Sequence, residues 1–202
     1  MTDIHASKIA VAGSSGELAL PRRSFFARAG QATLSASAVI LLAGGAIGGH
    51  GKTADAASAE SDVRILNTAL GAEQEAVAAY QVGAESGLLS NEVMKVAVQF
   101  QGHHKEHADL LAKTVGQLGG QAVEPLASYD FPVDKLKTEA DVLQFAAGLE
   151  KGAVSAYLGA VPLFDNRDLA KAAASILGDE AMHWAVLRGA LGEDPVPVAF
   201  VS

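Results

Sequence analysis

The chain has 202 residues, of which 50% are hydrophobic, 19% are charged and 5% are aromatic. This length suggests one domain with an additional segment. Acidic residues outnumber basic ones by 23 to 15 and no basic stripe is present, so nucleic acid is not an expected partner. The absence of cysteine excludes disulfides, thiolate metal sites, iron–sulfur clusters and cysteine nucleophiles. Any chemistry must therefore use carboxylate, imidazole, phenol or hydroxyl groups.

Residues 1–56 differ in character from the rest of the chain. Arg22 and Arg23 precede an apolar run over residues 36–49, and small residues follow over 54–59. The run is shorter than the roughly 20 apolar residues that a membrane-spanning helix needs. We therefore expect an export signal, cleaved after Ala56 or Ala59, and no stable membrane anchor after processing. The pattern resembles a twin-arginine signal, which implies the twin-arginine export machinery as a partner and a periplasmic or otherwise exported location.

From residue 61 to residue 191, apolar positions recur at alternating steps of three and four residues, the spacing of amphipathic helices. Capping and stop signals divide this region into four predicted helices. These signals are Gly87, Ser90, Gly119, Thr138 with Asp141, Asp165 and Gly192. A connection over residues 119–137, with two prolines, separates the second helix from the third. The sequence predicts an all-α, antiparallel four-helix bundle over residues 57–192 and an extended C-terminal tail over 193–202.

Eight polar side chains occupy core positions of these helices, where apolar residues are expected. They are Glu73, Tyr80, His104, His107, Glu150, Tyr157, Glu180 and His183. A buried carboxylate without a partner costs several kcal/mol, so three of them need compensation, which a metal cation would supply. Imidazole nitrogens together with carboxylate oxygens suit iron, manganese or zinc better than calcium or magnesium.

The two halves of the predicted bundle repeat the same spacing. In both halves a Glu precedes a Tyr by seven residues, and it precedes a His by 34 residues in the first half and by 33 in the second. The positions are Glu73, Tyr80 and His107, and then Glu150, Tyr157 and His183. A pseudo-twofold axis would bring the polar side chains of all four helices together at one height in the bundle.

These motifs resemble the signature of the ferritin-like superfamily, one Glu from each of two helices and a Glu-x-x-His from each of the other two. Glu73 and Glu150 match the lone glutamates, and residues 180–183 match one full Glu-x-x-His. Residues 104–107 keep the histidine but have His104 where a Glu is expected. The resemblance covers residues 61–191 and is strongest to exported ferritin-like domain proteins. It implies a bundle whose long connection crosses between the second and third helices.

The resemblance also implies a function. In proteins of this kind two iron or manganese ions react with dioxygen or peroxide, as in ferroxidases, manganese-type catalases or small oxidases. The residues expected to ligate the ions are Glu73, His104, His107, Glu150, Glu180 and His183. Zinc is the less favoured metal. Tyr80 and Tyr157 are expected to orient the carboxylates by hydrogen bonds from outside the ligand set.

Two alternatives remain open from the residues alone. A neutral imidazole at His104 offers one lone pair to one ion, whereas a Glu can bridge two. The site could therefore hold one ion, or none, in a non-catalytic or stress-protective protein of the cell envelope. Residues that lie off the core stripes are expected outside the ligand set: Glu75, His103, Glu106 and Asp179. The possible partners are metal ions, a small-molecule oxidant and further copies of the chain in a homo-oligomer.

Overall fold

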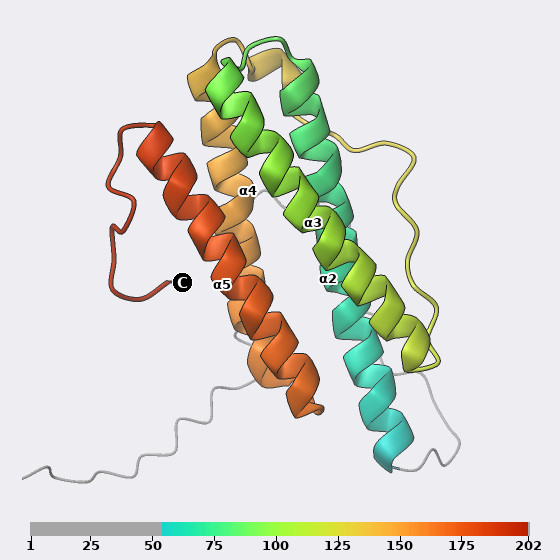
Figure 1. Ribbon diagram of the computed structural model, residues 1–202. Coiled ribbons are helices and arrows are strands. Elements are labelled where there is room, and N and C mark those ends of the chain that lie inside the picture. The colour runs from blue at the N-terminus through green and yellow to red at the C-terminus, as the bar shows by residue number, and fades with distance from the viewer. Residues whose placement is uncertain (1–53, 202) are drawn as a thin grey trace, which may run out of the picture. The chain divides into compact units, whose positions relative to one another are not determined.

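A computed structural model describes residues 54–201, so residues 1–53 of the predicted export signal lie outside the described part of the chain. Four long helices form a bundle (Figure 1), namely α2 (Ala54–Glu85), α3 (Asn91–Gln117), α4 (Glu139–Ala160) and α5 (Arg167–Ala190). Two 3₁₀ turns, η1 (Val133–Lys135) and η2 (Val161–Leu163), lie between them. Over the described range there is no strand, which confirms the predicted all-α class, and no helix there is long and apolar enough to cross a membrane.

The predicted helix signals act where they were expected. The Ser90 hydroxyl accepts a hydrogen bond from the backbone N–H of Val93 at the start of α3. Thr138 and Asp141 form the predicted capping box at the start of α4. The three predicted stop glycines, Gly87, Gly119 and Gly192, adopt φ values of 70°, 76° and 74°, which side chains with a Cβ disfavour.

The first helix begins earlier than the sequence pattern predicts. α2 starts at Ala54 rather than near residue 61, within the small-residue string that we assigned to the export signal. Alanine has the highest helix propensity of all residues, so an alanine-rich string can extend a helix as well as resemble a cleavage site. The apolar periodicity gave no sign of this extension because it begins only after residue 61.

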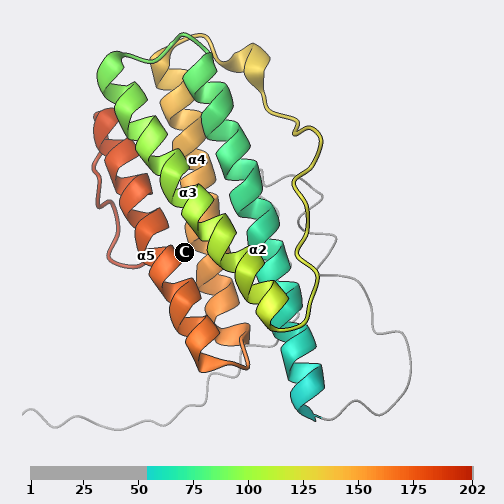
Figure 2. The ribbon, with the colours of Figure 1, turned by 45° about the vertical axis from the view of Figure 1, so that its right-hand side comes forward.

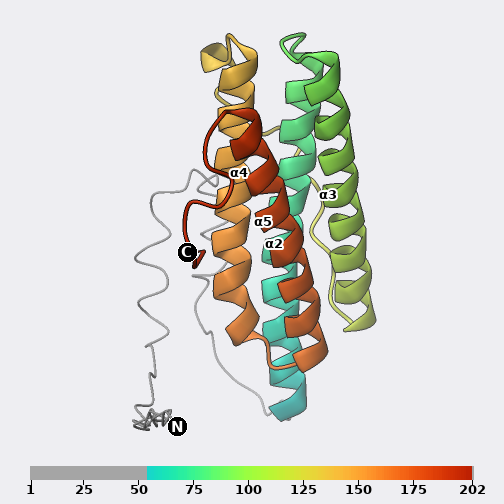
Figure 3. The ribbon, with the colours of Figure 1, turned by 60° about the vertical axis from the view of Figure 1, so that its left-hand side comes forward.

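The helices pack as two antiparallel pairs, α2 with α3 and α4 with α5 (Figure 3). α3 and α4 run in the same direction, so the connection between them travels the length of the bundle, as the resemblance implied (Figure 2). This crossover is attached to α2. The side chain of Asn67 donates to the carbonyl of Gln121 and accepts from the N–H of Val123, both at 2.9 Å, and Gln74 donates to the carbonyl of Val123 at 3.0 Å.

Two further contacts hold the connections against α2. A Cβ at Gly120 would lie 2.6 Å from Cγ1 of Val63, so only glycine lets the crossover pass α2 this closely. The buried carboxylate of Asp62 accepts hydrogen bonds from the backbone N–H groups of Asp165 (2.9 Å) and Asn166 (3.0 Å). It thereby joins α2 to the turn before α5, a contact that the periodicity of α2 did not reveal.

The core consists of two apolar clusters with a polar layer between them. One cluster contains Ile65, Leu66, Leu70, Leu111, Val115, Tyr157, Phe164, Ala170, Ala173 and Ile176. The other contains Tyr80, Phe100, Leu143, Ala147 and Leu187. Along each helix, the polar core positions lie between the residues that belong to the first cluster and those that belong to the second. The fold therefore encloses the polar layer on both sides with apolar side chains.

Candidate metal centre

All four helices contribute to the polar layer. α2 and α4 each supply one glutamate, and α3 and α5 each supply a pair of side chains three residues apart, which share one helix face. The structure thus brings together the six residues expected to ligate ions: Glu73, His104, His107, Glu150, Glu180 and His183. Five of these side chains are at most 2% exposed, and His107 is 14% exposed. The layer is therefore almost closed to water.

The two tyrosines join the halves of the bundle. The hydroxyl of Tyr80 on α2 donates to Oε1 of Glu150 on α4, and the hydroxyl of Tyr157 on α4 donates to Oε1 of Glu73 on α2, the latter at 2.5 Å. Burial, followed by the charge of the neighbouring glutamate, raises the pKa of both phenols well above 10, so they remain donors. Each tyrosine fixes the carboxylate of the opposite half. From the sequence the tyrosines were expected to orient the carboxylates, but the spacing did not indicate which carboxylate each would reach.

His104 lies between the two lone glutamates. Its Nδ1 is 2.8 Å from Oε2 of Glu73, and its Nε2 is 3.3 Å from Oε1 of Glu150. Burial alone would lower the pKa of His104, but the hydrogen bonds to Glu150 and Glu73 outweigh it and raise the pKa to about 11. The imidazole that bonds Glu73 is therefore charged.

Without a bound ion, protons would balance the charge of the layer. Burial raises the pKa of Glu180 to about 9, with help from Glu150 and against the effect of the neighbouring His107, so this carboxyl is neutral near pH 7. Burial would lower the pKa of His107, but Glu180 and Glu73 raise it to about 9. Contacts with histidines hold the pKa of Glu73 and of Glu150 below its usual range, against the effect of burial. Two carboxylates therefore face two imidazolium groups.

Several buried polar atoms of the layer nevertheless make no hydrogen bond. They are Nδ1 of His107, Nδ1 of His183, Oε2 of Glu150 and both carboxylate oxygens of Glu180. Nδ1 of His107 is 3.1 Å from Oε1 of Glu180, but the two groups are not aligned for a hydrogen bond. An unsatisfied buried polar group costs about 1–3 kcal/mol. Nitrogen and oxygen atoms left free in this way fit a cation that binds to several of them at once.

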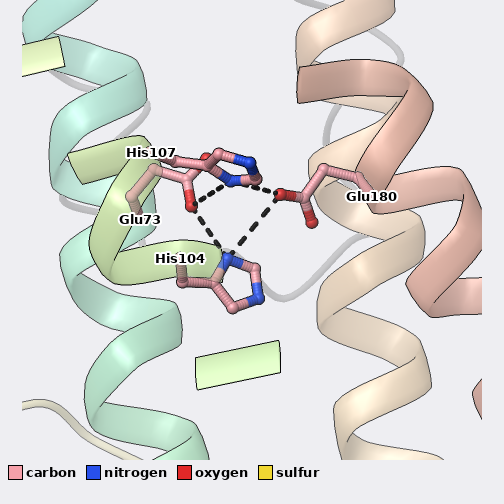
Figure 4. A group of neighbouring side chains, drawn as sticks. All are labelled: Glu73, His104, His107 and Glu180. Carbon is pink, nitrogen blue, oxygen red and sulfur yellow. Dashed lines mark hydrogen bonds and ion pairs between the residues drawn. The ribbon is translucent and has the colours of Figure 1, made fainter. Parts of the chain in front are cut away.

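The ligand atoms form two neighbouring groups. In the first, atoms of Glu73, His104, His107 and Glu180 all lie within 4.8 Å of one another, and Figure 4 shows these four side chains converging from α2, α3 and α5. In the second, atoms of His104, Glu150, Glu180 and His183 do the same. Glu180 and His104 belong to both groups.

The two shared residues differ in what they can offer. Oε1 of Glu180 is 3.1 Å from Nδ1 of His107, and Oε2 is 3.8 Å from Nδ1 of His183. Each oxygen thus faces a different group, an arrangement that suits a carboxylate shared by two ions. A neutral His104 has a lone pair on only one nitrogen and can serve one group at a time. Without His104, each group keeps two carboxylates and one imidazole, a ligand set that suits iron, manganese or zinc.

Two residues that were expected outside the ligand set, His103 and Asp179, lie next to the layer. Nδ1 of His103 is 3.1 Å from Oδ2 of Asp179 and 2.9 Å from Nε2 of His183. The repeat contained a signal for this pair. His103 precedes His107 by four residues, as Asp179 precedes His183, so each shares a helix face with a predicted ligand. Glu106 is exposed, as expected, whereas Glu75 is buried on α2.

Comparisons with known proteins agree with the fold. A family model described as "Ferritin-like domain" matches residues 61–193. No curated protein matches the sequence. Among solved structures, the chain is similar to the crystal structure of a conserved hypothetical protein from Mycobacterium tuberculosis, with a TM-score of 0.62 and 22% sequence identity. The alignment covers 71% of this chain and 99% of that one. A likeness at this identity concerns the fold.

Proposed function

This chain belongs to the ferritin-like domain family, and on that premise we propose that it is an exported redox protein that binds iron or manganese in the Glu/His layer and acts on dioxygen or peroxide. The observation that carries the proposal is the set of five buried nitrogen and oxygen atoms without a hydrogen bond. They come from four side chains on three helices. A purely structural network would leave few such atoms unsatisfied.

The side chains would hold the ions and the protein would control access to them. The first ion would be held by Glu73, His107 and Glu180, the second by Glu150, Glu180 and His183, with His104 on one of the two. Iron or manganese would supply the one-electron steps toward dioxygen or peroxide, which the side chains lack. The tyrosines keep the carboxylates in place, and the two apolar clusters exclude water.

The small size of the neighbouring cavities favours a small oxidant. A cavity of about 30 Å³ adjoins Tyr80, and one of about 20 Å³ adjoins Tyr157. Both are lined mainly by apolar side chains, and volumes of this size hold a molecule comparable to water. Each has room for a molecule the size of dioxygen or hydrogen peroxide.

The proposal includes export. The resemblance of residues 22–59 to a twin-arginine signal supports a periplasmic or otherwise exported protein without a stable membrane anchor. Because that machinery carries folded proteins, the ions would be loaded before export. Small assemblies would be easier to export than a large storage cage, so we rank iron storage below redox chemistry.

A second candidate function follows from His104. As a cation between Glu73 and Glu150, it lets the layer balance its charge without any metal ion. The protein would then be a non-catalytic or stress-protective envelope protein with one ion or none. The two candidate functions share the same fold and differ in whether the protein turns over dioxygen or peroxide.

The test is metal loading followed by an assay. Purified protein is incubated anaerobically with Fe²⁺ or Mn²⁺, freed of unbound ion and analysed for metal per chain, after which consumption of dioxygen and hydrogen peroxide is measured. We expect up to two ions per chain and rates at least about tenfold above those of the same amount of free metal. Bound ions with rates equal to free metal would support the second candidate, and absence of bound iron or manganese would contradict the first.

The tyrosine bonds give a separate prediction. Replacing Tyr80 or Tyr157 with Phe removes the donor that orients a ligand carboxylate, and loss of such a partner typically weakens metal affinity about 10–100-fold. We expect this loss in titrations of each variant with Mn²⁺. Tyr129→Phe is the control, because the hydroxyl of Tyr129 contacts the N–H of Leu126 in the crossover. Equal affinities in all three variants would show that the phenols do not position ligands.

A further inference from the structure

A third group of possible ligand atoms lies on the outer side of the buried layer. It consists of Nδ1 of His103, Oδ2 of Asp179 and Nε2 of His183. The two nitrogens are 2.9 Å apart, and they lie 3.1 Å and 3.2 Å from the Asp179 oxygen. We call these three residues the outer cluster. Its members come from α3 and α5, which belong to different helix pairs.

The outer cluster extends from the surface to the buried layer. The side chains of His103 and Asp179 are 34% and 22% exposed, whereas that of His183 is 2% exposed. In the two groups of the buried layer, the most exposed side chain is His107, at 14%. Within the part of the chain that the structure describes, the outer cluster is therefore the potential ligand group that solvent ions reach most readily.

Two imidazole rings connect the outer cluster to the buried layer. His183 presents Nε2 to Asp179 and Nδ1 to Glu150, the latter at 3.5 Å from Oε1. His107 likewise presents Nε2 to Oδ2 of Asp179 at 3.4 Å and Nδ1 to Oε1 of Glu180. Asp179 thus faces the outer nitrogens of two residues whose inner nitrogens, both buried and without a hydrogen bond, point into the layer.

Ring stacking holds His183 in place between the outer cluster and the buried layer. The ring of Phe100 stacks on that of His183 with centroids 4.0 Å apart, and the rings of His103 and His183 stack at 5.0 Å. Phe100 itself is buried in the apolar core. His183 therefore has little freedom to turn away from either the outer cluster or the buried layer.

We propose that His103, Asp179 and His183 form an outer capture site for a divalent first-row transition-metal ion, from which the ion passes to the buried layer. Two imidazoles and one carboxylate are ligands that such ions accept. Transfer needs no redox step. As the ion moves inward from Nε2 to Nδ1 of His183, the ring releases the proton of Nδ1 and takes one up at Nε2, from which it can donate to Oδ2 of Asp179. The transfer step rests on the proposed function, since it assumes that the buried layer binds metal.

The test separates the rate of loading from the final occupancy. Co²⁺ is a suitable probe, because its absorption spectrum reports binding without any enzymatic activity. The full chain, its His103→Ala variant and its Asp179→Asn variant are mixed with Co²⁺ in a stopped-flow instrument, and the bound cobalt per chain is measured afterwards. We expect both variants to load at least about tenfold more slowly, with unchanged final occupancy of the buried layer. Glu106→Gln, an exposed change on α3, is the control and should load like the parent chain.

Three results would overturn the inference in distinguishable ways. Unchanged loading rates would show that the outer cluster captures no ions. A lower final occupancy in Asp179→Asn with an unchanged rate would show that Asp179 only orients His183 and His107. If the parent chain binds no Co²⁺, Mn²⁺ or Fe²⁺ at all, the proposed function fails and the transfer step fails with it.

Discussion

Replacing Glu180 with Gln is expected to abolish the metal centre while leaving the metal-free fold intact. Glu180 belongs to both ligand groups, so its loss removes a carboxylate from each. We expect metal affinity to fall more than the roughly 100-fold that loss of an outer partner costs. In the metal-free protein the pKa of Glu180 is about 9, so a neutral amide replaces a neutral carboxyl there near pH 7. The unfolded chain ionises Glu180 above about pH 4.5 but cannot ionise Gln, so the variant without metal should be at least as stable as the parent near pH 7.

Two measurements on the same samples check this expectation. Titration with Mn²⁺ gives the affinity, and urea unfolding with and without the ion gives the stability. An ion at 100 times its dissociation constant adds about 2.7 kcal/mol to the parent chain by mass action, and this gain should disappear in the variant. Glu124→Gln, an exposed change in the crossover, is the control. Undiminished binding by Glu180→Gln would place the ions elsewhere, and an unfolded variant would mean that Glu180 is not held as a neutral acid.

Much of the fold could be predicted from sequence because it depends on local signals. Ser90, Thr138 and Asp141 act through hydrogen bonds to backbone groups within three residues. The 3.6-residue period likewise identifies which face of a helix is buried. For the same reason the six Glu and His residues of the layer could be selected, since a titratable side chain on an apolar stripe conflicts with burial. The contact of Asp62 with the turn before α5 could not be predicted, because its partners lie about 100 positions away.

The internal repeat predicted which residues form the site but not which of them contact one another. It showed that Tyr80 and Tyr157 occupy equivalent positions, but periodicity says nothing about which neighbouring helix a side chain reaches. Each tyrosine proved to bond the glutamate of the other half. The contacts of His103 and Asp179 with the layer were not predicted, because both residues lie at the edge of the stripe and are only partly buried. Comparing the two halves position by position, rather than each helix with an ideal stripe, would have identified them.

The protonation state of the layer was beyond sequence reasoning, because it depends on distances between helices. His104, taken alone, would be mostly neutral near pH 7, and Glu180 would be ionised. The contact of His104 with two carboxylates, and the burial of Glu180 beside Glu150, reverse these states. The balance of charge by protons is therefore a property of the assembled bundle.

From the protonation of the layer we expect the stability of metal-free and metal-loaded protein to depend on pH in opposite ways above pH 6.5. Glu180 titrates near 4.5 when unfolded and near 9 in the metal-free fold, so between these values the fold holds a proton that the unfolded chain has released. The stabilising effect of protonated His107 is complete below about 6.5 and is lost as the pH rises through about 9. His104 acts in the same direction up to about 11. The stability of the metal-free protein must therefore fall as the pH rises from 6.5 to 9.

The metal-loaded protein should behave in the opposite way, because the ion has already displaced the protons that the layer would lose. Protons compete with the ion for the same nitrogen and oxygen atoms, so apparent affinity, and with it stability, increases with pH. We expect Tm of the metal-free protein to fall by several degrees between pH 6.5 and 8.5, since a loss of about 1 kcal/mol corresponds to about 3 °C for a domain of this size. With saturating Mn²⁺, Tm should hold or rise. Parallel changes in the two forms would show that metal and protons do not exchange at this layer.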